Sequence, residues 1–147
     1  MIPVAADLRP VLVVGVFDLF HRGHVELLRR ARELGSCLHV VVNGDHLTSA
    51  YKRRPVMTED DRLAIVSACR YVDRAEVSND YDIKPYVERH GIRVIVHGDD
   101  WERASYLHQI RVTEDYLRAR DMELVFLPYY RGESTSDLRR RIREERP

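Results

Sequence analysis

The sequence has little cysteine and no net charge. Its 147 residues include two cysteines, Cys37 and Cys69, without Cys-x-x-Cys spacing or a zinc-type cluster with histidine, which excludes a disulfide-rich or zinc-stapled scaffold. Free thiols are typical of a reducing compartment, so we expect a cytoplasmic protein. The 24 basic residues are balanced by 24 acidic ones, so no overall field attracts nucleic acid or an anionic membrane surface.

Long hydrophobic runs are also missing. The longest run near the amino end, Val11–Phe17, is interrupted at once by Asp18 and follows no charged segment or cleavage site, so neither a secretion signal nor a membrane span is expected. The chain has the length of one domain, and its hydrophobic content of 44% is enough for a core without staples. We therefore expect a single domain over residues 1–147.

Strand-like and helix-like segments alternate along the chain. Short apolar runs predict five strands, at Val11–Val14, Leu38–Val42, Ala75–Val77, Val94–Val96 and Leu124–Leu127. Apolar residues at helical spacing predict helices at Val25–Leu34, Thr58–Cys69, Ile83–His90, Ser105–Arg120 and Ser136–Glu145. The stretch Gly44–Met57 has little periodicity and is predicted to be a mobile loop. This order specifies an α/β fold, a single Rossmann-like domain with a five-stranded parallel sheet and helices on both faces.

The segment after the first predicted strand carries the chemistry. It contains Gly15, Phe17, Asp18, His21 and His24 in the pattern Gly-x-Phe-Asp-x-x-His-x-Gly-His. Two histidines three residues apart at a helix start share one face with the N–H groups of the first turn, and phosphate binds well at such a place. Since ligands of open parallel sheets bind beyond the carboxyl ends of the strands, we expect the active site here.

This pattern resembles the signature of the cytidylyltransferase branch of the nucleotidyltransferase superfamily. Three later segments resemble further elements of the family, namely Arg70–Asp73, Gly98–Trp101 and Arg131–Asp137. The elements together cover residues 11–142, and the resemblance is strongest to bacterial glycerol-3-phosphate cytidylyltransferases. The Thr-Ser-Asp ending of the last element is nearer to the choline- and ethanolamine-phosphate enzymes.

The resemblance implies an enzyme of the EC 2.7.7 type. An oxygen of a small phosphate or phosphonate would attack the α-phosphorus of CTP and release pyrophosphate, with no covalent enzyme intermediate. Mg²⁺ is expected as the cofactor because both substrates are anionic and Asp18 and Asp99 add to the repulsion. The two histidines are too few ligands for a metal site of the protein itself. We expect a homodimer, and no nucleic-acid or membrane partner.

The resemblance also assigns candidate residues. His21 and His24 would donate hydrogen bonds to the α-phosphate, with Lys52, Arg53 and Arg70 as further catalytic candidates. The nucleotide-binding candidates are Gly15, Val16, Phe17, Asp18, His21, His24, Arg70, Gly98, Asp99, Trp101, Arg131, Ser134, Thr135 and Ser136. Ser134–Asp137 also has the composition of a helix N-cap, and Asp73 would help to shape the site.

The chain departs from the family pattern at two positions. Tyr129 stands where the family has an arginine, so that either Arg131 replaces that arginine or the site is weaker there. Tyr51 stands where the family has a lysine, which leaves the Lys52–Arg54 segment as either a closing flap or a solvated basic loop. Arg62 is either a counterpart of a basic family residue or the partner of Glu59 one helical turn away.

Several interpretations remain open from the sequence. An adenylyltransferase of the heptose-phosphate or FAD-synthetase type shares the histidine loop, although the segment Gly98–Trp101 favours CTP. A nucleotide-binding regulatory module without turnover is a third possibility. The arginine run Arg139–Arg143 is interpreted as a favourable helix C-terminus rather than a nucleic-acid contact. An apolar stripe in the fourth predicted helix is expected to be core or dimer surface: Tyr106, Leu107, Ile110, Tyr116 and Leu117.

Overall fold

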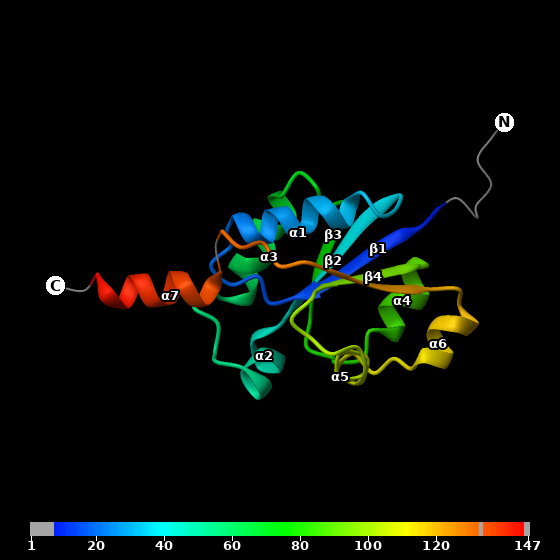
Figure 1. The fold of residues 1–147 in the computed structure, drawn as a ribbon. Helices are drawn as coiled ribbons and strands as arrows, with labels where there is room; N and C mark the ends of the chain where they lie inside the picture. Colours follow the sequence, from blue (N-terminus) through cyan, green and yellow to red (C-terminus); the bar gives the residue numbers. More distant parts are fainter. Residues whose placement is uncertain (1–7, 133, 146–147) are drawn as a thin grey trace.

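The computed structural model describes residues 8–132 and 134–145, and its centre is a five-stranded parallel sheet (Figure 1). The strands are β1 (Pro10–Gly15), β2 (Cys37–Asn43), β3 (Arg74–Ser78), β4 (Val94–Gly98) and β5 (Glu123–Leu127), in the order β3-β2-β1-β4-β5. The strand order reverses between β1 and β4, and such a reversal opens a crevice at the carboxyl ends of the strands. The predicted α/β architecture is confirmed.

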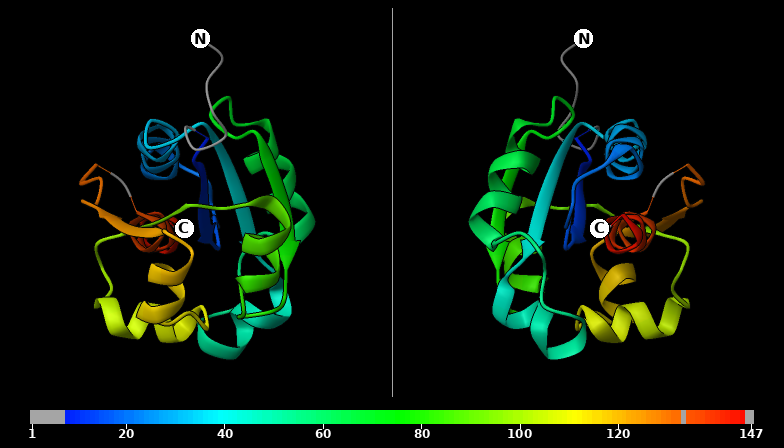
Figure 2. Two further views of the ribbon diagram at one scale, coloured as in Figure 1. Left: turned by 90° about the vertical axis from the view of Figure 1, so that its right-hand side faces the viewer. Right: turned by 90° about the vertical axis from the view of Figure 1, so that its left-hand side faces the viewer.

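Helices cover both faces of the sheet, as Figure 2 shows. One face is covered by α1 (Arg22–Arg32) and α3 (Glu59–Ala68), and the other by α4 (Lys84–His90), α5 (Arg103–Gln109) and α6 (Glu114–Ala119). Along β1, Val11 and Val13 pack into the core of the α1 side, and Leu12 and Val14 into the core of the other side. Burial on both faces explains why β1 is a continuous apolar run.

The prediction of a mobile loop over Gly44–Met57 was wrong in its first half, which forms α2 (Asp45–Tyr51). Leu47 and Thr48 are buried, and the side chain of Asn79 accepts a hydrogen bond from the N–H of Leu47 at 3.1 Å. A helix of seven residues is unstable alone, so these contacts from another part of the chain decide its formation. Periodicity within the segment could not show them.

The prediction of one helix over Ser105–Arg120 was also wrong, because the chain breaks between α5 and α6. Arg111 takes a left-handed conformation with φ of 62°, which ends α5. The hydroxyl of Thr113 then accepts a hydrogen bond from the N–H of Tyr116 at 3.0 Å and begins α6. Leu107 and Leu117 are buried in the core, so the apolar stripe is core.

The remaining elements agree with the sequence to within a few residues. Thr58 caps α3, and Gly91 ends α4 with a φ of 65° that favours glycine. The last helix, α7 (Thr135–Glu144), begins at a Ser134 cap and extends away from the sheet (Figure 1). No helix in the described part of the chain is long and apolar enough to cross a bilayer.

Candidate active site

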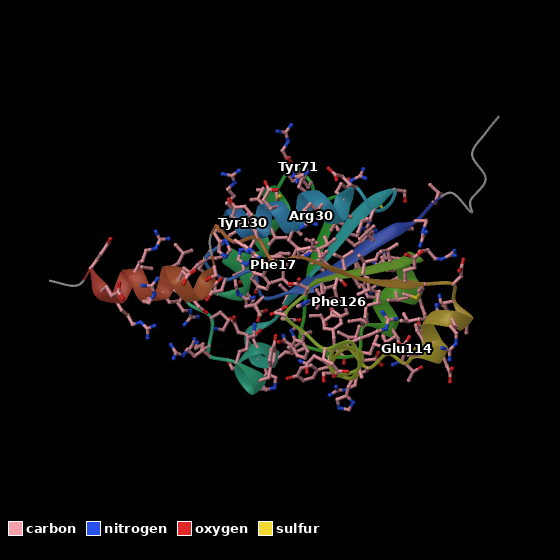
Figure 3. The ribbon with its side chains drawn as sticks, viewed as in Figure 1. Phe17, Arg30, Tyr71, Glu114, Phe126 and Tyr130 are labelled. Carbon is pink, nitrogen blue, oxygen red and sulfur yellow. The ribbon has the colours of Figure 1, made fainter. Side chains whose placement is uncertain are left out.

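A cavity of about 770 Å³ opens at the carboxyl ends of the strands. Figure 3 labels Phe17 and Tyr130, which both line it. The sequence-predicted residues that line the cavity are Gly15, Val16, Phe17, Asp18, His21, His24, Lys52, Arg53, Gly98, Trp101, Arg131, Ser134, Thr135 and Ser136. Loops that are far apart in the sequence therefore meet at the predicted place. Glu133, inside the last predicted motif, lies outside the described residues.

His21 and His24 hold each other at the start of α1. Nδ1 of His21 accepts a hydrogen bond from the N–H of Gly23 at 3.0 Å, and Nδ1 of His24 accepts one from the N–H of His21 at 3.2 Å. The two rings lie 3.9 Å apart between centroids. Because both Nδ1 atoms are acceptors, each neutral ring carries its proton on Nε2. The capping arrangement thus makes each histidine a donor through Nε2.

Thr135 connects this histidine pair to the start of α7. Nε2 of His21 lies 3.4 Å from the hydroxyl oxygen of Thr135, and that hydroxyl donates to the carbonyl oxygen of Asp18 at 3.0 Å. The N–H groups of a helix start favour an anion. The α1 and α7 starts therefore meet at one point of the cavity, which suits phosphate groups.

His24 is neutral in the folded protein. Burial, together with the adjacent His21, lowers the pKa of the His24 imidazole to about 3. A proton on Nδ1 would also break its hydrogen bond with the N–H of His21. His24 is consequently a hydrogen-bond donor rather than a cation near neutral pH.

We predict that the His24 ring does not titrate between about pH 8 and 5, because its pKa of about 3 lies far below the ordinary 6.5. Between those two pKa values the unfolded chain binds more protons than the folded one, so the free energy of unfolding should fall as the pH drops below about 6.5. An NMR titration of the His24 ring, assigned with a His24→Gln variant, measures its pKa. A titration midpoint near 6.5 would contradict the assignment.

Asp18 joins three segments of the chain. Its buried carboxylate accepts hydrogen bonds from the N–H groups of Val56 and Met57 at 2.8 and 3.0 Å, and from the guanidinium of Arg139 at 2.9 Å. Burial by itself raises the pKa of Asp18, but these hydrogen bonds outweigh burial and the net pKa is lowered. Asp18 thus anchors both the loop that follows α2 and the helix α7, and Arg139 offsets the charge of its carboxylate.

Arg62 is fully buried and ties the loops after β1 and β2 together. It donates to the carbonyl oxygens of Val16 and Asn43 at 2.8 and 2.7 Å, and it pairs with Asp45 at 2.7 Å. The interpretation that Arg62 pairs with Glu59 was therefore wrong. Asp45 is 17 positions away, so helical spacing could not identify it.

Three candidates of the sequence analysis do not line the cavity. Arg70 follows α3, and its guanidinium lies 5.9 Å from the ring centre of Tyr71. The side chain of Asp99 accepts a hydrogen bond from the N–H of Tyr129 at 3.2 Å and holds that turn. Asp73 lies at the amino end of the sheet, where it accepts from the N–H of Leu38 and pairs with Arg32, so its expected role in shaping the site was wrong.

Other residues of the cavity wall were missed. Arg139 and Arg143, four positions apart on α7, both line the cavity, although the run that contains them was interpreted as a helix C-terminus. Their spacing behind the Ser134 cap places them on one helix face and was the available signal. Arg30, Tyr81 and Tyr106 also contribute to the wall. No local motif marks these three.

Comparison with known proteins gives matches over most of the chain. A family model described as cytidylyltransferase-like matches residues 12–141. Glycerol-3-phosphate cytidylyltransferase of Bacillus subtilis is 32% identical over 136 residues, which cover 92% of this chain and 98% of that protein. FAD synthase of Thermoplasma volcanium is 30% identical over 141 residues, which cover 91% of this chain and 94% of that protein.

Two further matches concern a longer protein and a solved structure. Ethanolamine-phosphate cytidylyltransferase of Arabidopsis thaliana is 42% identical over 95 residues, which cover 63% of this chain but 23% of that protein. This chain thus matches less than a quarter of the plant protein. The crystal structure of the lipopolysaccharide core biosynthesis protein of Thermoplasma volcanium has a TM-score of 0.68 at 25% identity, covering 86% of this chain and 99% of that one.

Proposed function

This chain belongs to the cytidylyltransferase-like family, and on that premise we propose that it transfers a cytidylyl group from CTP to a small phosphate or phosphonate and releases pyrophosphate. One observation carries the proposal: the histidine pair at the start of α1 presents Nε2 donors beside the start of α7, in a cavity large enough for a nucleotide and a small acceptor. Relatives of nearly this length include a glycerol-3-phosphate cytidylyltransferase.

The proposed reaction is an in-line displacement at the α-phosphorus. An acceptor oxygen forms the new P–O bond while the bond to the bridging oxygen of the β-phosphate breaks, and the electron pair leaves with pyrophosphate. The acceptor is already deprotonated near neutral pH, so no protein base or nucleophile is required. His21 and His24 donate from Nε2 to the oxygens where negative charge builds up, which is worth most in a preorganised site.

Mg²⁺ would accompany the triphosphate rather than occupy a site made by the protein. No three His, Cys, Asp or Glu side chains gather as metal ligands in residues 8–132 and 134–145, and the carboxylate of Asp18 already accepts from three backbone N–H groups and Arg139. When bound, the ion would neutralise phosphate charge. The residues of this chain bind and orient the substrates.

The segment after α2 is proposed to close on the acceptor, and Arg54 in the same segment provides a control. Lys52 and Arg53 line the cavity, whereas the side chain of Arg54 is not part of its wall. We expect Lys52→Ala and Arg53→Ala to lower kcat/KM for the acceptor about tenfold each, with a weaker salt dependence, because each removes a cation near the anionic acceptor. Arg54→Ala should match wild type. Equal kcat/KM for the acceptor in all three variants would contradict the proposal that this segment closes on the acceptor.

ATP is the second candidate nucleotide, because the FAD synthase relative aligns over 91% of this chain. The segment His97–Trp101 at the end of β4, which resembles the family element that favours CTP, is proposed to read the base. The test is pyrophosphate release from each of the four nucleoside triphosphates with Mg²⁺ and a panel of glycerol, ethanolamine and choline phosphates and phosphonates. Calorimetry with CTP and ATP measures binding separately.

The outcomes separate the three classes of function. Turnover with CTP and one acceptor supports the cytidylyltransferase. Turnover with ATP, or ATP binding as tight as CTP binding, would assign the adenylyl branch instead. Binding of a nucleotide without pyrophosphate release for any acceptor would favour a regulatory module.

A further inference from the structure

Tyr106 is a polar side chain that the reaction described above does not use. It lies on α5 with 3% of its surface exposed, and its ring packs against His97, Trp101 and Phe126 at centroid distances of 4.5, 5.7 and 5.9 Å. It also forms part of the cavity wall. Its hydroxyl is buried and has no hydrogen-bond partner among the described residues.

A buried hydroxyl without a partner is unfavourable for folding. Nearly all buried polar groups in proteins are hydrogen bonded, and leaving one unsatisfied costs free energy that a phenylalanine at the same place would not. The ring contacts around Tyr106 would be available to phenylalanine too. The hydroxyl therefore needs an explanation outside the packing of the core.

The surroundings of Tyr106 differ from the phosphate end of the cavity. The phosphate end has the histidine pair and the arginines of α7. Figure 2 shows α2 and α5 on the other side of the molecule from α1. The cavity wall there combines aromatic, apolar and acidic residues, among them Leu47, Tyr51, Tyr81, His97, Asp100 and Trp101.

Tyr106 packs against His97 and Trp101 of the segment proposed to read the base, and Tyr51 relates the same region to the acceptor. Tyr51 directly precedes Lys52 and Arg53, the cations assigned to the acceptor, and Nζ of Lys52 lies 5.9 Å from the centre of its ring. Burial, with smaller contributions from Tyr51 and Asp100, raises the pKa of the Tyr106 phenol. The hydroxyl accordingly stays protonated at neutral pH and can donate as well as accept.

We propose that the hydroxyl of Tyr106 hydrogen bonds to the organic part of the acceptor and makes Tyr106 a specificity-determining residue. The ligand class is a small phosphate or phosphonate whose organic part carries a hydroxyl or amino group. This inference rests on the proposed function. The hydroxyl is enclosed among the described residues, so the proposal requires that neighbouring side chains move aside to admit the ligand group. An enclosed hydrogen bond discriminates strongly against substrates that lack the partner.

The test compares wild type and Tyr106→Phe with three acceptors and CTP. Glycerol 3-phosphate offers hydroxyl groups, phosphoethanolamine offers an ammonium group, and ethyl phosphate offers neither. We expect Tyr106→Phe to lower kcat/KM about ten- to a hundredfold for the acceptor whose group is recognised. With ethyl phosphate the two enzymes should be equal, the KM of CTP should not change, and Tm should stay level or rise because a buried unpaired hydroxyl is removed.

Tyr116→Phe is the matched control, because it removes a tyrosine hydroxyl that bonds Glu88 at the protein surface. The inference is contradicted by an equal loss for all three acceptors, by a raised KM for CTP, by no change at all, or by a lower Tm with no dependence on the acceptor. If wild type uses none of the acceptors, the proposed function fails and the inference fails with it. Normal turnover that is independent of Tyr106 contradicts the inference alone.

Discussion

Replacing His21 or His24 with alanine is expected to lower turnover by about 10²- to 10³-fold, or roughly 3 to 4 kcal/mol of transition-state stabilisation. Each replacement removes an Nε2 donor whose direction is set by the capping hydrogen bonds at the start of α1. Water that replaces the ring is not preorganised for the charge that develops in the transition state. The loss should therefore appear in kcat, and binding of CTP should change much less. Steady-state pyrophosphate release measures the effect.

A second variant separates catalysis from helix capping. His21→Asn keeps a side chain that caps helices well but has no donor at the position of Nε2, so it should retain the Tm of wild type and lose turnover as His21→Ala does. His108→Ala, at an exposed position of α5, is the control and should be fully active. If the His21 and His24 variants kept more than about a tenth of the wild-type rate, the catalytic site would lie elsewhere.

The largest loss of stability is expected for Arg62→Ala. Arg62 is fully buried, makes hydrogen bonds to three carbonyl oxygens and pairs with Asp45. Its removal takes a buried donor from these three carbonyl oxygens and from the carboxylate of Asp45, which is 34% exposed. Each buried acceptor left without its donor costs about 1 kcal/mol or more, so we expect a loss of about 3 kcal/mol. Denaturant unfolding, monitored by circular dichroism, gives the free energy directly.

Arg89→Ala is the control for Arg62→Ala. Arg89 pairs with Glu76 at the same distance of 2.7 Å, but its side chain is 60% exposed. Exposed pairs contribute about 1 kcal/mol or less, so this variant should be close to wild type in stability. An Arg62→Ala protein as stable as the Arg89→Ala protein would contradict the structural role of Arg62.

The fold was predictable because its signals are local. A strand covered by helices on both faces must be apolar throughout, and runs such as Val11–Val14 and Leu38–Val42 show this without knowledge of their neighbours. Thr58 and Ser134 mark helix starts for the same reason, since a cap bonds to N–H groups within its own turn. The histidine pair could be assigned to a helix start because both histidines lie within four residues.

Elements that depend on distant residues were not predictable. Helix α2 forms because Asn79 and Glu59 bond to its first turn, and neither residue is part of the segment. Asp18 was expected to repel phosphate, but Arg139, 121 positions away, offsets its charge. The sequence contains these residues without indicating that they meet.

The sequence alone thus determined the five strands, the helices α1, α3, α4 and α7, the position of the site at the carboxyl end of β1, and the histidine pair in it, because periodicity, caps and a contiguous motif are properties of short segments. Only the tertiary structure decided that Arg62 and Asp18 hold the loops together, that α7 contributes Arg139 and Arg143 to the cavity, and that Tyr106 is buried in its wall. Parallel topology brings the ends of separate strands together across long stretches of chain, and contacts made in this way have no spacing that a sequence could display.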